Sequence, residues 1–588
     1  MRKRKLIISL ISISTLLLST MTVGCNGSNP AASLLEKYNN WANPQQSYEK
    51  ASIEESFEIK DKDSLYTDEF GGEVLYLTIS KDDKKEETWK NLNLHELNWY
   101  KENDENPVEC DVLVQFGNEE GPTSGCFGYA DISANASIKL SGSKASEKQQ
   151  KSYKIKLKSS SGTVSGASSF VLSKGFTDPY RFTNKLCYDL MSECDDMFSL
   201  RTQFVHVYVK DENEGSDSLF VDYGMYTLVE SVNKKYLASR DLDKTGELYK
   251  INNFDFKRHE DVIVQPTDAS YDQDKFEEYL EAKGSEDYTC LINLLDALND
   301  PSSDIDDIIK HYFDEDNLYD WMAFNILMDN KDTDTENFYL YSPTGSDKFY
   351  FIPWDYDGAL REDYNILKDE DYSAGWEKGI YIYTESELFK RIISNEHSLG
   401  KLEEHVDKLH NSVLSAENVS NKAKALAEEV EPKLYTLPDR TYAKVTKENY
   451  EILVDKIEQR IDDNFYAFYD SIETPWPFHI NDPEMDNENV IITWDEALNI
   501  KSGTTYSIEL SDSWDFKNNI VNQTGLSETK YNLGNLETGE YFVRIRAYSE
   551  SGMVQDAYEF YNTEKKTTIH GVVCFYVFDD GSVVVSRF

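Results

Sequence analysis

The acidic segment from Asn330 to Asn337, NKDTDTEN, holds three carboxylates and two amides within eight residues. It follows the apolar run LYDWMAFNILM and precedes the strand-like FYLY, so a turn between buried elements would hold its side chains in fixed positions. A hairpin pattern comes next, in which SPTGSD joins FYLY to KFYFI, and it leads to PWDYDG with Asp355 and Asp357. The order is an acidic loop, a hairpin and a second acidic turn.

Phosphoryl transfer needs this set of groups. A carboxylate accepts the proton of the attacking hydroxyl, and oxygen ligands hold magnesium against the triphosphate. In protein kinases the base Asp and a metal-binding Asn stand five residues apart, and a hairpin carries the chain to a second metal-binding Asp. Asp332 and Asn337 have this spacing, and Asp355 lies beyond the hairpin. Spacing alone does not decide the matter, because short acidic stretches are common in so acidic a chain.

Two other interpretations of the loop compete with this one. Asn330, Asp332 and Asp334 alternate as calcium ligands do, but an EF-hand needs Gly at its sixth position and Glu at its twelfth. Those positions hold Thr335 and Tyr341 here, which argues against calcium. A plain polar turn would be favoured if the loop stood alone, but the attached hairpin and the WDYDG segment disfavour it.

The segment NKDTDTENFYLY…KFYFIPWDYDGAL resembles the signature of the CotH family, the atypical kinases named after spore coat protein H. Other family landmarks recur in order: KSYKIKL at Lys151 to Leu157, GMYTLVESVNKKYL at Gly224 to Leu237, and LYK at Leu248 to Lys250. The resemblance spans about Glu73 to Ser471. It implies an α+β fold, an atypical protein-kinase-like domain with a β-rich N-terminal part and a helical C-terminal part.

The resemblance also implies roles for individual residues. Asp332 would be the catalytic base, and Asn337 with Asp355 would bind Mg²⁺, with ATP as the co-substrate. Asp357 would support the metal or fix the turn. These assignments predict a kinase active site around the loop and the WDYDG turn.

A lysine that contacts phosphate is expected on the strand YKIKL. Lys154 and Lys156 point to the same face of a strand, so period cannot choose between them, and the family pattern favours Lys156. Glu230 would pair with it, as a Lys–Glu pair does in ordinary kinases. Many family members carry Arg-Gly-Asn-Ser before this strand, whereas this chain has SIKLSGSKAS with Lys139 and Ser143 at the Arg and Asn positions. That departure leaves open a slow or non-catalytic member.

The regular elements follow from periodicity. VLYLTIS, VLVQF, SIKL, SYKIKL, QFVHVYV and GMYTLVE alternate as antiparallel strands do, and NKLCYDLMSEC between them has helical spacing. The texture becomes helical from Phe276, with buried helices around 287–298 and 317–328 and a second helical block at 386–471. The kinase-like domain is therefore assigned to residues 73–473.

A β-sandwich is predicted after the TPWPF boundary. Trp494, the turn at Leu536 to Gly539, and Tyr541 to Ala547 resemble the landmarks of a fibronectin type III module, assigned to residues 474–564. Residues 565–588 are predicted as a C-terminal β tail. Such modules mostly serve as spacers or binding platforms, so no catalytic role is assigned to this one.

The N-terminus has the form of a secretory signal. MRKRK is a basic region, LIISLISISTLLLSTMTV is apolar, and TVGC ends at Cys25 in a form similar to a lipoprotein cleavage box. Residues 1–25 are thus predicted to be a bacterial signal peptide that leaves Cys25 lipidated, and residues 26–72 a linker. The expected location is extracytoplasmic, with a membrane anchor at Cys25, and simple secretion is the alternative.

Charge and cysteine content limit the partners. Sixty Lys and Arg against 108 Asp and Glu give a net charge of −48, which repels phosphate backbones and makes nucleic acid an improbable partner. Six cysteines remain after Cys25 and permit disulfides, for which the local candidates are Cys110/Cys126 and Cys187/Cys194.

Two classes of function fit these observations. The first is an exported kinase that transfers the γ-phosphate of ATP to Ser or Thr of a protein on the surface or outside the cell. The second is a non-catalytic cell-surface binding or assembly protein with a decayed kinase-like fold. Loss of phosphate transfer on replacing Asp332 or Asp355 separates them.

Overall fold

The computed structural model describes residues 59–586, apart from 68–69, 216, 361–377, 502 and 564–567. The predicted signal peptide, the lipidation site Cys25 and most of the predicted linker lie outside the described residues. Among the helices that are described, none combines the length and apolarity needed to cross a membrane.

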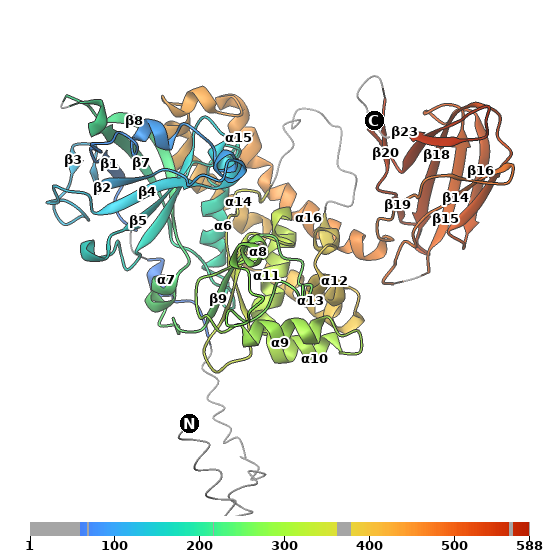
Figure 1. Cartoon of the computed structure of the whole chain (residues 1–588), viewed down its shortest axis with the longest axis horizontal. Helices are drawn as coiled ribbons and strands as arrows, with labels where there is room; N and C mark the ends of the chain where they lie inside the picture. Colours follow the sequence, from blue (N-terminus) through green and yellow to red (C-terminus); the bar gives the residue numbers. More distant parts are fainter. Residues whose placement is uncertain are drawn as a thin grey trace, which may run out of the picture. The chain divides into compact units, whose positions relative to one another are not determined.

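The N-terminal part of the predicted kinase-like region, residues 73–473, is a curved sheet with strand order β1-β7-β8-β6-β5-β4-β2-β3 (Figure 1). β1 also pairs with β2, so the sheet closes on itself around an apolar core. β1 and β7 are parallel, and the other neighbours are antiparallel. The strands are β1 (Val74–Ile79), β2 (Glu109–Asn118), β3 (Gly121–Pro122), β4 (Ala136–Ser141), β5 (Ser152–Leu157), β6 (Ser169–Ser173), β7 (Thr202–Asp211) and β8 (Val221–Glu230).

Alternation explains most of this sheet. In β5, Tyr153, Ile155 and Leu157 enter the core while the lysines between them face the other side. Every predicted strand forms, but β6 was not predicted, because its SFVLS is short and lacks alternation. Short helices accompany the strands: α3 (Trp89–Leu92), α4 (Leu97–Glu102), α5 (Ser143–Ser146), α6 (Thr183–Met191) and α7 (Lys234–Ser239).

A second sheet, in the order β10-β9-β11-β12, lies in the helical half of the kinase-like region. The elements are β9 (Glu247–Ile251), α8 (Gln273–Tyr279), β10 (Leu280–Ala282), α9 (Thr289–Leu298), α10 (Ile305–Tyr312), α11 (Glu315–Leu327), β11 (Phe338–Ser342) and β12 (Tyr350–Pro353). α11 begins at the cap Asp314, whose carboxylate accepts the Asn317 amide at 3.1 Å. Its residues from Asn317 onward are all buried, which confirms the prediction of a buried helix before the acidic loop.

The second helical block contains α12 (Glu387–Ile393), α13 (Glu396–His410), α14 (Ala416–Leu434), α15 (Lys447–Asp455) and α16 (Ile457–Glu473). α13 and α16 pack on α11, so they support the helix that leads into the acidic loop. The segment between α14 and α15 reaches the first sheet, where the buried Asp439 accepts the Met225 amide at 2.8 Å.

The C-terminal region has three sheets, and the two larger ones share one apolar core, as in a β-sandwich. Trp494 is buried there, and the Tyr541 hydroxyl donates to the Glu537 carbonyl at 3.0 Å, as in a tyrosine corner. β22 and β23 pair with each other and β22 pairs with β18, so these two strands of the predicted tail belong to the largest sheet, whereas β21 pairs with β20 in a separate sheet. The strands are β13 (Glu484–Asp486), β14 (Asn489–Thr493), β15 (Thr505–Ser511), β16 (Asn519–Leu526), β17 (Lys530–Gly534), β18 (Gly539–Tyr548), β19 (Val554–Asp556), β20 (Phe560–Asn562), β21 (Thr568–His570), β22 (Val572–Val577) and β23 (Val583–Ser586).

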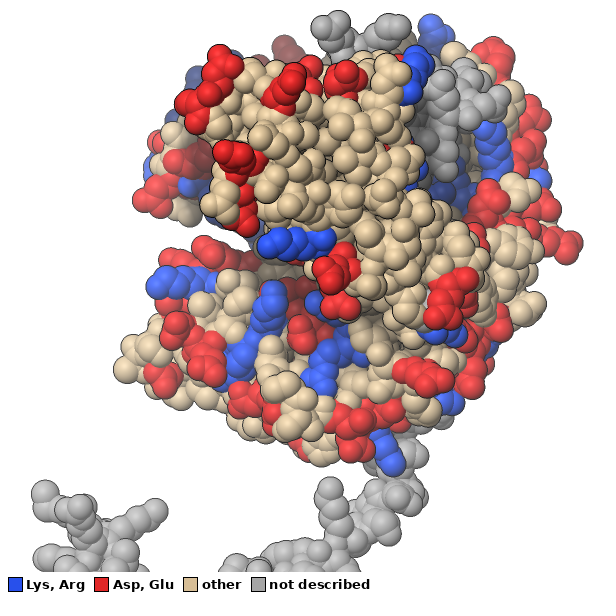
Figure 2. Space-filling model, turned by 90° about the vertical axis from the view of Figure 1, so that its right-hand side faces the viewer, with Lys and Arg blue, Asp and Glu red and all other residues tan. Residues whose placement is uncertain are grey.

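The six described cysteines are all free, so the disulfide candidates Cys110/Cys126 and Cys187/Cys194 are not bridged. Burial raises the pKa of the Cys110 thiol to about 12 and that of Cys187 well above its usual range, which makes both unreactive. Acidic side chains are spread over the surface in Figure 2, with Lys and Arg gathered mainly in the lower half of that face. This agrees with a solubilising role for most of the acids.

Candidate active site

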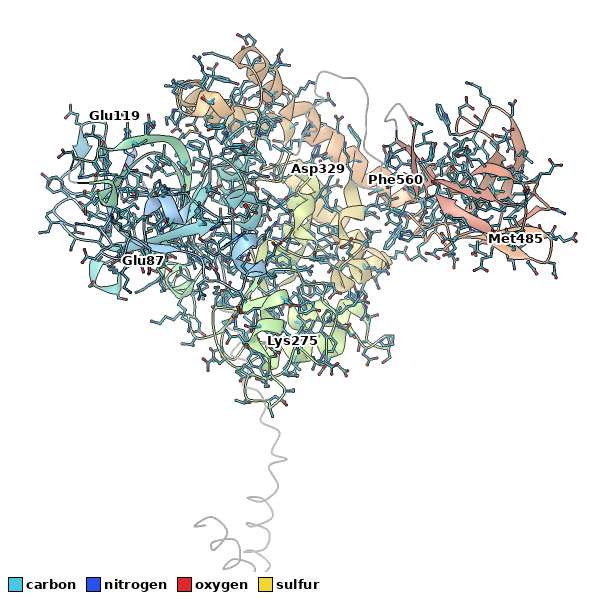
Figure 3. The ribbon with its side chains drawn as sticks, turned by 45° about the horizontal axis from the view of Figure 1, so that its top comes forward. Glu87, Glu119, Lys275, Asp329, Met485 and Phe560 are labelled. Carbon is cyan, nitrogen blue, oxygen red and sulfur yellow. The ribbon has the colours of Figure 1, made fainter. Side chains whose placement is uncertain are left out.

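Hydrogen bonds between the buried residues Asn325 and Asn330 hold the start of the acidic loop. α11 is followed by Asp329, labelled near the centre of Figure 3, whose φ of +47° turns the chain out of the helix. The buried Asn330 then donates from its backbone to the Asn325 carbonyl at 2.9 Å and from its side chain to the Asn325 amide oxygen at 3.2 Å. Thr333 donates back to the Asn330 carbonyl at 3.0 Å. These bonds fix the loop to the end of α11, so it is not a freely solvated turn.

The hairpin brings the two halves of the predicted site to one end. In the register of β11 and β12, Phe338 pairs with Pro353, and the Trp354 amide donates to the Asn337 carbonyl at 3.2 Å. Asn337 and Asp355 therefore flank the same open end of the hairpin. Both have left-handed φ angles, +66° and +56°, which Asn and Asp tolerate better than most residues.

Asp332 and Asp357 are the other two site residues predicted at this end of the hairpin. Asp332 lies in the 3-10 turn η4 (Lys331–Thr333), next to the buried Thr333, but its side chain is outside the described part of the structure. Asp357 is half-buried in the turn of residues 357–360, two residues beyond Asp355. The backbone thus places the predicted base and metal ligands on two adjoining segments.

The two lysines of β5 differ in burial, and the more buried one is not the lysine that was predicted to contact phosphate. Lys156 is exposed, whereas Lys154 is half-buried and faces lysines from both sheets. Burial, with the neighbouring Lys283, lowers the pKa of Lys154 to about 8, and Lys139 and Lys250 add to the effect. The sequence favours Lys156 by family pattern, but Lys154 is the lysine in the cationic cluster.

The cationic cluster is defined as Lys139, Lys154, Lys250 and Lys283. Glu281 lies opposite Lys250 across β10 and β9, and Tyr339 lies opposite Lys250 across β9 and β11. Burial raises the pKa of Tyr339, and the charges of Glu281 and Asp355 raise it further. The four lysines gather positive charge in a chain of net charge −48, and Glu281 pairs with Lys283 among them.

The predicted pair of Lys156 and Glu230 is wrong, and the register gives the reason. Lys156 pairs with Ser169, and Glu230 pairs with Phe170, the next residue of β6. Successive residues of a strand point to opposite faces, so Glu230 lies on the core face and Lys156 on the other. The alternation of side chains along each strand shows which face Lys156 and Glu230 occupy only when the pairing of β5 and β8 with β6 is also known.

Glu230 is instead buried between two arginines. Its carboxylate accepts from the Arg201 guanidinium at 2.6 Å and from the Arg240 guanidinium at 3.1 Å. Arg240 also donates to Asp61 at 2.8 Å. Burial alone would raise the pKa of Glu230, but Arg240 and Arg201 hold it below its usual value. Glu230 therefore joins a buried ionic network on the core side of the sheet.

A family model described as CotH kinase protein matches residues 138–464. The chain belongs to the CotH kinase family. No curated protein matches it. This CotH-family chain is thus kinase-like, and the matched region includes the loop, the hairpin and the cationic cluster described above.

Two solved structures show weak likeness to this CotH-family chain. One is the HipA–HipB toxin–antitoxin complex of Shewanella oneidensis MR-1 with its operator DNA, at 10% identity and a TM-score of 0.21, covering 54% of this chain and 60% of that one. The other is the twitchin kinase region of C. elegans, at 10% identity and a TM-score of 0.15, covering 72% and 70%. These scores are too low to support an argument about fold.

The donor chemistry of the CotH-family site fits magnesium. Asn337 and Asp355 offer an amide oxygen and a carboxylate at one end of a hairpin, the hard oxygen ligands that Mg²⁺ prefers. The described residues contain no group of three or more His, Cys, Asp or Glu side chains that could hold a metal ion. In the predicted assignment, Asn337 and Asp355 are the residues that would hold Mg²⁺.

A third residue of the loop, Asp334, was not among the predicted site residues. It is buried, and its Oδ2 accepts the Glu385 amide at 3.1 Å, just before α12. Burial raises its pKa to about 7. A hollow of about 330 Å³ lies here, lined by Lys331, Asp334, Thr335, Glu336, Tyr381, Ile382, Thr384, Glu385 and Tyr558. The signal in the sequence was only its place between the predicted base and the predicted metal ligand.

Proposed function

We propose that this CotH-family protein transfers the γ-phosphate of ATP to Ser or Thr of a protein outside the cytoplasm. The observation that carries the proposal is the hairpin end that Asn337 and Asp355 flank, beside the loop that contains Asp332. The family match supports the kinase class. The basic and apolar N-terminal segment ending at Cys25 supports export and a lipid anchor.

Each group has a distinct task in this proposal. Asp332 accepts the proton of the acceptor hydroxyl, while Asn337 and Asp355 hold the metal, and Asp357 supports the turn. Bound Mg²⁺ would neutralise charge that develops on the β- and γ-phosphates. Lys154 and its neighbours in the cationic cluster oppose the remaining phosphate charge. The closed sheet and the helical part supply these groups from separate elements.

A non-catalytic binding or assembly role is the second candidate. The observation that favours it is SGSKAS, where many family members have Arg-Gly-Asn-Ser. With Gly142 and Ser143 at the Gly and Asn positions, Ser141 and not Lys139 stands where the motif has its Arg, so the positive charge is lost at that position. Lys139 lies two residues earlier in β4, directly opposite Lys154.

The wild-type protein tests the proposal directly. Incubation with γ-labelled ATP and Mg²⁺ is expected to label the protein itself or an added serine-rich acceptor, and EDTA should abolish the label because the metal ligands lose their ion. Filter counting and intact mass measure the transfer. Mg²⁺-dependent ATP binding without any label would favour the binding role, and absence of both would contradict the kinase proposal.

Lys154 rather than Lys156 is expected to determine ATP affinity. Lys154→Met should weaken Mg·ATP binding by about tenfold to a hundredfold, the effect of losing one partly buried charge contact. Lys156→Met is the matched control, on the same strand and the same face but exposed, and should change Kd less than about twofold. Isothermal titration measures both, and equal effects of the two substitutions would contradict this assignment.

The pH dependence of ATP affinity provides a second test of the role of Lys154. Because its pKa is about 8, it loses its charge as pH rises through that value, whereas an ordinary lysine stays protonated. ATP affinity of the wild type should therefore fall between pH 7 and 9, and this fall should be much smaller in Lys154→Met. A slope unchanged by the substitution would assign the titration to another group.

A further inference from the structure

Two side chains of α6 hold the backbone of the metal-binding turn. The Asp355 amide donates to the Tyr188 hydroxyl oxygen at 2.9 Å, and the next amide, that of Tyr356, donates to the Asn184 side-chain oxygen at 3.2 Å. Asn184 and Tyr188 are four residues apart, so they lie on one face of the helix. Consecutive amides of an irregular turn are thus bound by consecutive turns of one helix.

These contacts are sheltered from water. Tyr188 and Tyr356 are both almost fully buried, and their rings lie 5.9 Å apart between centroids. On the other side, the Leu360 amide donates to the Met328 carbonyl at 2.7 Å, which ties the end of the turn to the end of α11. The turn is therefore held between α6 and α11, and removal of a buried partner would leave an amide unsatisfied.

Asp355 has a left-handed backbone conformation, and the hydrogen bonds of the turn stabilise it. Its φ of +56° costs free energy relative to an extended or helical conformation, and neighbouring contacts must compensate. The Tyr188 hydroxyl binds the amide of this same residue. Loss of the bond would let the backbone relax and turn the Asp355 carboxylate away from the side of Asn337.

We propose that Tyr188 and Asn184 are positioning residues that fix Asp355 for metal binding, so that α6 sets the geometry of the metal site. The inference rests on the proposed function for the identity of the metal, but the positioning itself does not depend on catalysis. α6 packs on β7 and α14 (Figure 1), so a shift of this helix would move Asp355 with it. Neither residue touches the nucleotide in this proposal.

Hydrogen exchange tests the positioning in the protein without ligands. Tyr188→Phe should speed exchange of the amides in residues 354–360 by about fivefold to tenfold, the effect of one lost hydrogen bond. Asn184→Leu, a second variant, should act on the same peptide. Tyr236→Phe is the matched control, because it removes another buried tyrosine hydroxyl, which donates to the Ser199 carbonyl at 3.0 Å, but does not touch the turn.

Magnesium dependence tests the link to the metal. Tyr188→Phe should raise the Mg²⁺ concentration for half-maximal ATP binding by about tenfold, with little change for Tyr236→Phe. Unchanged exchange in residues 354–360 would overturn the positioning role, and faster exchange with an unchanged Mg²⁺ midpoint would overturn the link to the metal. A wild type that binds no ATP would defeat the proposed function, and exchange would still decide the positioning.

Discussion

Replacing Asp355 by asparagine is expected to lower phosphate transfer by about a thousandfold, because a metal ligand loses its charge where several kcal/mol of transition-state stabilisation arise. Asparagine is the sharper choice than alanine at this position. It keeps the size of the side chain and tolerates the φ of +56°, so the turn survives the change. Initial rates with γ-labelled ATP at saturating Mg²⁺ measure the loss.

Asp332→Asn should lower the rate by a factor on the order of a hundred to ten thousand, the usual contribution of a general base, with ATP affinity nearly unchanged. The two variants therefore differ in kind. Asp355→Asn weakens Mg²⁺-dependent binding and rate together, whereas Asp332→Asn changes the rate alone. Asp347→Asn is the control, because this carboxylate is exposed at the opposite end of the same hairpin. A variant that transfers label as fast as wild type would remove that residue from the proposed machinery.

The sequence predicts the parts of this site that depend on local order. Helix, loop and hairpin between Asn317 and Pro353 follow from periodicity and turn chemistry, and the structure has them where the patterns place them. Local order also places Asn337 and Asp355 together, since a hairpin returns the chain to its starting end. The pairing of β11 with β12 is enough to bring these two residues to the same end of the hairpin.

The parts that failed depend on pairing between distant segments. The choice between Lys154 and Lys156 requires the second sheet, because Lys250 lies in β9 and Lys283 directly follows β10, both far along the chain. The role of Tyr188 also requires this long-range packing, since a tyrosine in an apolar helix reads as core whether or not its hydroxyl binds a distant amide. The pair of Lys156 and Glu230 failed because β6, which sets their relative faces, was not predicted.

Because Glu230 is buried between two arginines, we expect its replacement to lower the stability of the fold. Glu230→Gln should destabilise the folded protein by about 3–5 kcal/mol, because Arg201 and Arg240 would be left buried without a full counter-charge. Only 1% of the Glu230 side chain is exposed, so solvent screens the interaction little. Urea unfolding followed by tryptophan fluorescence measures the change. Glu120→Gln, at an exposed turn, is the control and should change stability by less than about 0.5 kcal/mol.

The pH profile separates this structural role from a ligand-binding one. Glu230 has a folded-state pKa below its usual value, so its contribution to stability is complete above the unfolded pKa of about 4.3 and is lost as pH falls through the folded pKa. The stability difference between wild type and Glu230→Gln should therefore be constant near neutrality and narrow below about pH 4. A variant with wild-type stability and impaired ATP binding would contradict the buried network and return Glu230 to the nucleotide site.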